Sequence, residues 1–159
     1  MIKRHMSLGF FAVCIIVFIM LLLRGHTIPD ETSVRQQLEE NRSDIDIITD
    51  YLINSGYTNV YIQNASGMIV ADQENVYIID SVVFDAINRV LDNYILINKL
   101  GNTIYLLQWR TAQDIGCGVA YTINGIDAPE IEFATKLVPL SDEGWYYYVS
   151  DYNAWRNSQ

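Results

Sequence analysis

The first pattern along the chain is an uninterrupted apolar run near the N-terminus. Residues 6–23 read MSLGFFAVCIIVFIMLLL and contain no charged side chain. A bilayer core of about 30 Å needs about 20 apolar residues at about 1.5 Å rise each. A helix packed in a soluble core shows a polar face, which this run lacks. The run therefore predicts a transmembrane helix.

Beyond a short linker at residues 24–32, the apolar positions take on a helical period. They lie 4, 7, 3 and 4 residues apart, at Val34, Leu38, Ile45, Ile48 and Leu52. This spacing describes one stripe on a helix. Ser33 and Gln36 fit a capping box, which predicts the helix start. Because Ser43 is also a good N-cap, the stripe predicts either one helix or two consecutive ones.

The next segments alternate or are rich in β-branched and aromatic residues, which is typical of strands. Residues 59–63 and 68–71 flank a polar turn and predict a hairpin, and residues 76–79 predict a further short strand. A cap at Asp80 or Ser81 then precedes a second helical pattern. Its stripe consists of Val83, Ile87, Val90, Leu91 and Tyr94.

The last third of the chain is dominated by strand patterns. Four β-rich runs are separated by turn signals: residues 103–109, 117–123, 131–137 and 145–149. Strands that are grouped along the chain favour an antiparallel sheet, and amphipathic helices need a face to cover. We therefore predict an α+β domain with an antiparallel sheet of about five strands and two or three helices packed mainly on one face.

Charged residues around the apolar run predict how the chain lies in a cell membrane. Lys3 and Arg4 precede the run, whereas Arg24 alone follows it before acidic residues begin. Positive charge stays on the cytoplasmic side, and no good small-x-small cleavage site follows the run. The predicted organisation has four parts: a cytoplasmic N-terminus at residues 1–5, an uncleaved single-pass signal-anchor at residues 6–23, the linker at residues 24–32 and an extracytoplasmic domain at residues 33–159.

The charge of the domain narrows the range of partners. All 19 Asp and Glu residues lie after residue 29, where the chain has only seven Lys and Arg residues, so the domain carries a formal charge of −12. Nucleic acids bind cationic surfaces that displace counterions, so no nucleic acid partner is predicted. The two cysteines are Cys14 in the apolar run and Cys117 in the domain. They cannot pair within one chain, so the fold depends on its core rather than on disulfides.

Residue types limit the chemistry of the domain. No histidine follows His26, which removes the usual general base and the commonest transition-metal ligand. Cys117 lies between Gly116 and Gly118, which fits either an exposed nucleophile or a small residue where strands approach closely. The second interpretation is favoured because no base is in sight. No catalytic residue, metal site or cofactor is predicted.

The aromatic residues supply a candidate binding surface. All eleven tyrosines and all three tryptophans lie in the domain. In a strand, Trp145 and Tyr147 share one face, and Tyr146 and Tyr148 share the other. Exposed Tyr and Trp provide large contact areas for peptides, sugars or proteins, which predicts binding residues at Trp145, Tyr146, Tyr148, Tyr152 and Trp155. The alternative is that both faces are covered and these side chains belong to the core.

The predicted order of elements suggests a class of function. The order strand, strand, helix and meander is similar to that of PAS-like extracytoplasmic sensor domains, whose first hairpin often carries an Asn/Asp-x-x-Gly turn like Asn64 to Gly67. The resemblance implies a sensing role. We therefore predict a membrane-tethered, non-catalytic binding or sensing module, anchored through residues 6–23, that contacts a protein, a peptide or a small ligand.

Two other classes of function stay open at this point. Gly9 and Phe10 precede the apolar helix as in a pilin-type N-terminus, although Cys14 stands where that family has Glu. This pattern favours a structural component of a membrane assembly. The many carboxylates also permit a hydrolase that uses two of them, which needs a cleft that holds both groups about 5–10 Å apart.

Overall fold

The helices and strands follow one another largely in the predicted order. The structure is a computed structural model that describes residues 28–158 except residues 65, 112–114, 126 and 141–143. Within this part, no helix is both long and apolar enough to cross a bilayer. The predicted signal-anchor at residues 6–23, which includes the pilin-like Gly9 and Phe10, lies outside the described residues.

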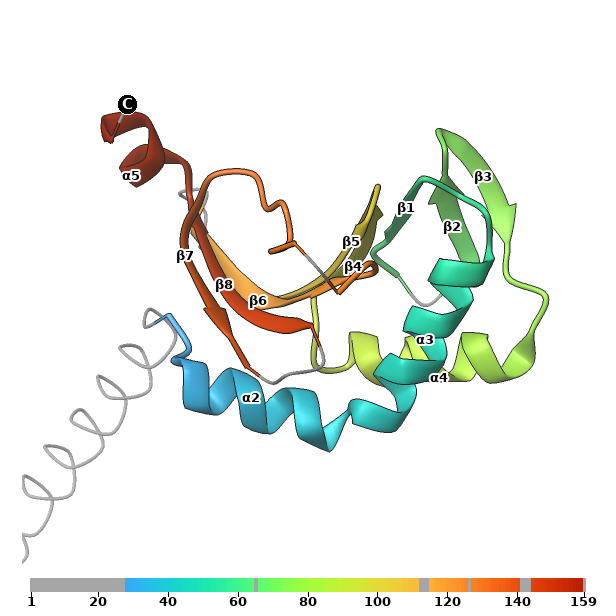
Figure 1. Cartoon of the computed structure of the whole chain (residues 1–159). Helices are drawn as coiled ribbons and strands as arrows, with labels where there is room; N and C mark the ends of the chain where they lie inside the picture. The colour runs from blue at the N-terminus through green and yellow to red at the C-terminus, as the bar shows by residue number, and fades with distance from the viewer. Residues whose placement is uncertain (1–27, 65, 112–114, 126, 141–143, 159) are drawn as a thin grey trace, which may run out of the picture.

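The described strands form one antiparallel sheet with eight members, in the order β3-β2-β1-β4-β5-β6-β8-β7 (Figure 1). Their bounds are β1 Asn59–Ile62, β2 Met68–Ala71, β3 Glu74–Tyr77, β4 Leu96–Leu100, β5 Thr103–Arg110, β6 Ile115–Thr122, β7 Ala134–Pro139 and β8 Trp145–Asp151. The α+β class is therefore confirmed, whereas the prediction of about five strands is wrong.

Strand β4 accounts for part of this difference. The predicted helical stripe extended to Tyr94, but the helix ends at Leu91 and Leu96–Leu100 form a strand between β1 and β5. Its residues alternate, with Ile97 and Lys99 buried and Leu100 exposed. Such alternation fits a strand with one covered face, and a run of five residues is too short to separate strand from helix by period alone.

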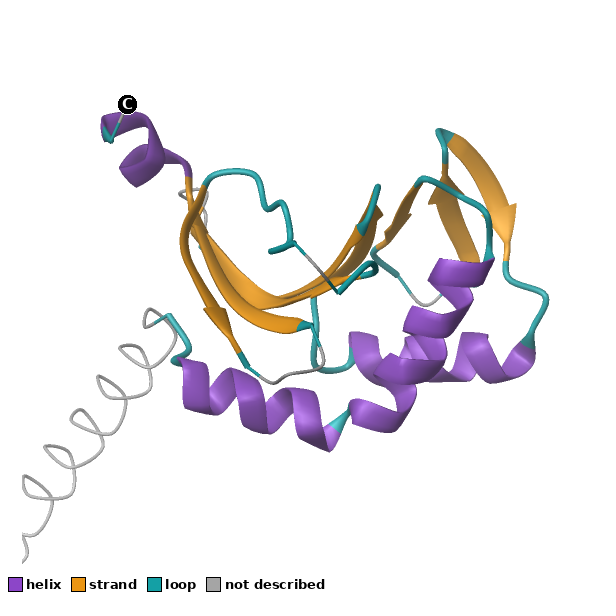
Figure 2. Ribbon diagram, in the orientation of Figure 1, coloured by secondary structure: helices purple, strands orange, loops and turns teal. Residues whose placement is uncertain are grey.

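Three helices cover one face of the sheet, and a short fourth ends the chain (Figure 2). They are α2 Glu31–Glu40, α3 Arg42–Asn54, α4 Ser81–Leu91 and α5 Tyr152–Asn157. The first stripe is thus two helices that break at Asn41 rather than Ser43. The helix start also differs from the prediction, because Asp30, and not Ser33, is the N-cap: its Oδ1 accepts a hydrogen bond from the Ser33 N–H at 2.8 Å.

The core lies between these helices and the outer face of a strongly curved sheet (Figures 1 and 2). The predicted helical stripes are buried, apart from the half-buried Leu91, so they face the sheet. Opposite them lie alternate strand residues: Val60, Ile62, Ile97, Ile104, Leu106, Val119, Trp145 and Tyr147. Burial of such side chains contributes about 1.5–3 kcal/mol each, so this layer supplies most of the driving force for folding.

One charged residue belongs to this core. Lys99 faces the helices and is 6 % exposed, and its Nζ donates a hydrogen bond to the Leu52 carbonyl at 2.6 Å. That carbonyl lies in the last turn of α3, where the helix dipole favours positive charge. Burial lowers the pKa of Lys99. The contact therefore fixes α3 to the middle of the sheet.

The linker segment is tied to the sheet before α2 begins. The Tyr147 hydroxyl donates a hydrogen bond to the Pro29 carbonyl at 2.9 Å. Tyr147 is itself a core residue at 2 % exposure, and burial raises its pKa to about 12. The described end of the predicted linker is consequently part of the packed domain.

Strand β6 lies between β5 and β8 and approaches the backbone of β5 closely at Gly118. Cys117 is fully buried, and burial raises the pKa of its thiol to about 12. Its burial fits the interpretation of a small residue at a close strand approach better than that of an exposed nucleophile. A β-bulge between Leu107 and Trp109 on β5 lies directly opposite. Bulges bend a strand and increase the local twist.

Candidate functional site

The inner face of the curved sheet, which we call the trough, carries none of the three large helices (Figure 2). One row of side chains crosses it through the strand register: Tyr61, Asn98, Tyr105, Ala120 and Tyr146. The connection between β6 and β7 runs across one end, where the Glu130 N–H donates to the Thr103 Oγ1 at 3.1 Å. The trough is therefore partly covered and rich in tyrosine.

Tyr148 lies in the trough beside this row. Its ring meets that of Tyr105 edge-on with centroids 6.1 Å apart, and Tyr148 is 2 % exposed. Within the described residues its hydroxyl has no hydrogen-bond partner, and burial raises its pKa well above 10. Buried hydroxyls in proteins are nearly always bonded to protein, water or ligand. The Tyr105 hydroxyl, by contrast, accepts a hydrogen bond from the Asn98 side chain.

A pocket of about 740 Å³ opens at the end of the trough, where β5 and β8 end and where β6 and α5 begin. Its lining combines apolar, aromatic, hydroxyl and cationic side chains: Leu107, Arg110, Thr111, Ile115, Gly116, Phe133, Ser150 and Tyr152. Small-molecule sites have volumes of about 300–1,000 Å³ and combine apolar walls with a few polar groups. The pocket fits this description in both size and lining.

Three aromatic rings form a cluster beside the pocket, which we call the aromatic wall: Phe133 and Tyr152 line the pocket, and Trp155 packs against both rings. Phe133 packs edge-on against Tyr152 and Trp155, with centroid distances of 4.9 and 5.1 Å. Asp151 caps α5 by accepting a hydrogen bond from the Ala154 N–H at 2.9 Å. Phe133 has a φ of +58°, a left-handed conformation that costs roughly 1–2 kcal/mol for a residue with a Cβ. The packing of Phe133 on α5 offsets this strain and holds the wall in place.

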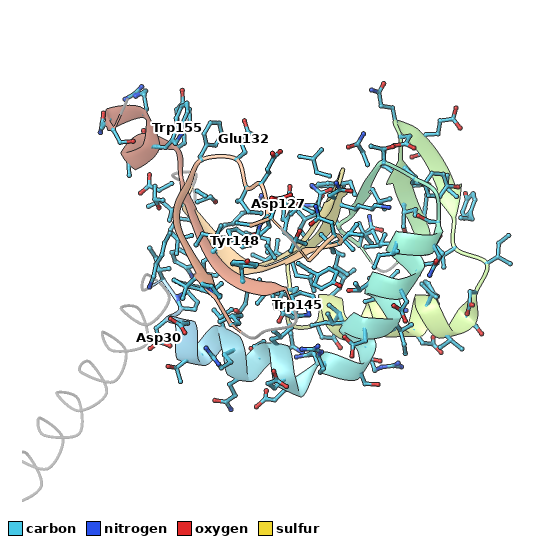
Figure 3. The ribbon with its side chains drawn as sticks, in the orientation of Figure 1. Asp30, Asp127, Glu132, Trp145, Tyr148 and Trp155 are labelled. Carbon is cyan, nitrogen blue, oxygen red and sulfur yellow. The ribbon has the colours of Figure 1, made fainter. Side chains whose placement is uncertain are left out.

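The predicted binding residues fall in three places. Tyr146 and Tyr148 lie in the trough, half-buried and buried, while Tyr152 and Trp155 belong to the aromatic wall. Trp145 lies on the helix side of the sheet (Figure 3), where it is 2 % exposed and its ring centroid lies 5.1 Å from that of Tyr121. The strand thus presents the two faces expected, with one in the core.

Several pocket residues were not predicted from the sequence. The position of Phe133 in the pocket depends on its positive φ, a conformation that the presence of an aromatic residue in the sequence does not predict. Arg110 and Ser150 come together because β5 and β8 both flank β6. The turn signals in the sequence mark where these strands end. Side chains at the ends of neighbouring strands gather at one end of the sheet, so this was the available signal for the pocket.

A smaller pocket of about 430 Å³ lies beside Trp145. It is lined by Arg42, Asp46, Thr49, Asp50, Ile53, Tyr121 and Trp145. Its charges are partly paired, since the Arg42 guanidinium lies 3.0 Å from the Asp46 carboxylate. Nearby, Asp44 accepts two hydrogen bonds from Arg89, at 2.7 and 2.8 Å, which holds the pKa of Asp44 below its usual value. Within the described residues no group of three or more His, Cys, Asp or Glu lies together as metal ligands.

Comparison with known proteins gives no match to a family model, a curated protein or a solved structure. The resemblance to PAS-like sensor domains therefore stays an analogy in the order of elements. A shared fold alone would not fix the function. Any functional conclusion has to come from the site itself.

Proposed function

We propose that the chain is a membrane-tethered binding or sensing module whose extracytoplasmic domain takes its ligand in the pocket at the end of the trough. The observation that carries the proposal is this open pocket, which Phe133 and Tyr152 of the aromatic wall line on one side. The described lining contains no carboxylate. Hydrolysis by paired carboxylates needs two of them in one cleft, so this lining favours binding over that chemistry.

Site-specific photocrosslinking in the full-length protein in its native membrane tests this proposal. In the variant Tyr152→p-benzoylphenylalanine, the reactive group replaces a pocket residue that is 37 % exposed. We expect ultraviolet light to give one defined adduct, because a bound ligand lies within reach of that wall. A protein partner would appear as a discrete shift on a gel, and a small ligand as a fixed mass increase.

The matched control places the same group at Tyr77 on the edge strand β3. Tyr77 is 71 % exposed and lies outside the pocket, so it reports unspecific collision with neighbouring proteins. The same adducts at both positions, or none at residue 152, would contradict a binding site at the aromatic wall.

The tether and its orientation are tested by cysteine labelling in intact cells. Ile79 is 96 % exposed, whereas the native Cys117 is buried with a raised pKa. In a chain that carries Cys14→Ser, we expect Ile79→Cys to react with a membrane-impermeant maleimide while the parent chain does not. Reaction needs an accessible thiolate, so the new thiol reports which side of the membrane holds the domain.

Permeabilised cells supply the reference for complete labelling. Labelling of Ile79→Cys only after permeabilisation would place the domain on the cytoplasmic side and overturn the proposed orientation. Release of the protein from membranes by alkaline carbonate would overturn the tether itself.

A further inference from the structure

The basic residues of the domain differ in what they contact. Six of the seven have a partner in the described part of the chain. Three pair with carboxylates, one donates to a helix carbonyl and two lie over tyrosine rings: Arg35, Arg42, Arg89, Lys99, Lys136 and Arg156. This is the expected outcome in a domain with 19 acidic and seven basic residues, because each cation has several carboxylates to choose from.

Arg110 is the exception. It ends β5, lines the pocket and is exposed, and within the described residues its side chain makes no hydrogen bond, ion pair or ring contact. A guanidinium presents five N–H donors in a planar fork that matches a carboxylate. In this pocket that fork has no protein acceptor among the described side chains.

The surroundings of Arg110 complete a site for an amphipathic ligand. Leu107 and Ile115 supply aliphatic surface, and Phe133 and Tyr152 supply ring faces. The Ser150 hydroxyl reaches the Gly116 carbonyl only at 3.5 Å, which is beyond the usual length of an O–H···O bond. This hydroxyl is therefore available to a second ligand atom near the guanidinium.

From this arrangement we propose that the ligand is an organic anion, with a carboxylate held by Arg110 and an aromatic or branched apolar body against the aromatic wall. The inference rests on the proposed function and names the ligand class of the same pocket. Because the domain has a formal charge of −12, no diffuse field attracts an anion. Recognition then depends on the local contact with Arg110.

Calorimetric titration of the full-length protein in detergent with two isosteric probes tests this assignment. The probes are 2-naphthoate, which carries the carboxylate, and 2-naphthamide, which is neutral with the same shape. We expect 2-naphthoate to bind at least about tenfold more tightly, since hydrogen bonds between charged partners are the strong ones. Arg110→Gln should abolish that preference and leave the affinity for 2-naphthamide unchanged.

Arg35→Gln is the matched control, because it removes the same charge from an exposed position on α2, where the guanidinium pairs with Glu31. It should leave both affinities within twofold of the parent protein. Equal affinity for both probes, unaltered by Arg110→Gln, would overturn the anion assignment and leave a neutral-ligand pocket. Failure of both probes to bind would also overturn it, while a crosslink at residue 152 would still support binding at the wall.

Discussion

Gly118→Ala is expected to lower the free energy of unfolding by at least about 3 kcal/mol, because overpacking against rigid backbone cannot relax. A Cβ at this position would lie 1.9 Å from the Leu106 carbonyl oxygen and 3.0 Å from the Gln108 nitrogen. Both atoms belong to the bulged strand β5. Since domains are stable by only about 5–15 kcal/mol, the variant should melt far below the parent protein when followed by circular dichroism.

Gly116→Ala, two residues away on the same strand, is the control. Its Cβ would meet the Leu107 Cδ1 at 2.9 Å and the Ser150 Oγ at 3.3 Å. Both are ends of side chains that can rotate, so we expect a loss of about 1 kcal/mol or less. Equal melting temperatures for the two variants would show that the close approach at Gly118 is not as described.

The second large effect is expected for Trp145→Ala. This side chain fills the core between the sheet and α3, stacks at a tilt on Tyr121 and lies under the Arg42 guanidinium, which is 5.8 Å from its ring. Removing a buried Trp leaves a large cavity and costs about 3–5 kcal/mol. The loss should appear as a lower midpoint of unfolding in urea.

Tyr146→Ala provides the comparison on the neighbouring position of β8. Tyr146 is half-buried and faces the trough, so its removal should cost clearly less than the loss of Trp145. If Trp145→Ala left stability unchanged but abolished ligand binding, the structural role described for this residue would be wrong. The prediction that Trp145 is a binding residue would then regain support.

The periodicity of apolar residues predicted those helices and strands that have one buried face and one solvent-exposed face. Val34, Leu38 and Ile45 gave the helical stripe, and the 145–149 run gave a strand with two distinct faces. Both features are local, because a period of 3.6 or 2 is written in consecutive residues. The pattern did not predict the residues at which the first stripe breaks, Asn41, and at which α4 ends, Leu91, since several nearby residues can cap or end a helix.

The candidate site was harder to predict because it is built from pairings between distant segments. Leu107, Gly116 and Ser150 meet only through the strand order β5-β6-β8. The strained Phe133 contributes to the aromatic wall by packing on α5, and the residues next to it in the sequence do not predict a left-handed backbone. Tyr152 and Trp155 were anticipated from their chemistry alone, without the partner that fixes them.

The tie between Tyr147 and Pro29 has a mechanical consequence. Tyr147 holds the entering chain on the outer side of β8, while Ser150, three residues further on, lines the pocket on the inner side. A strand paired on both sides is stiff along its length, so a shift of β8 on ligand binding would be passed to the point where the chain enters the domain. Under the proposed membrane attachment, a ligand that moved β8 would therefore also move the segment at Pro29 through which the chain enters the domain.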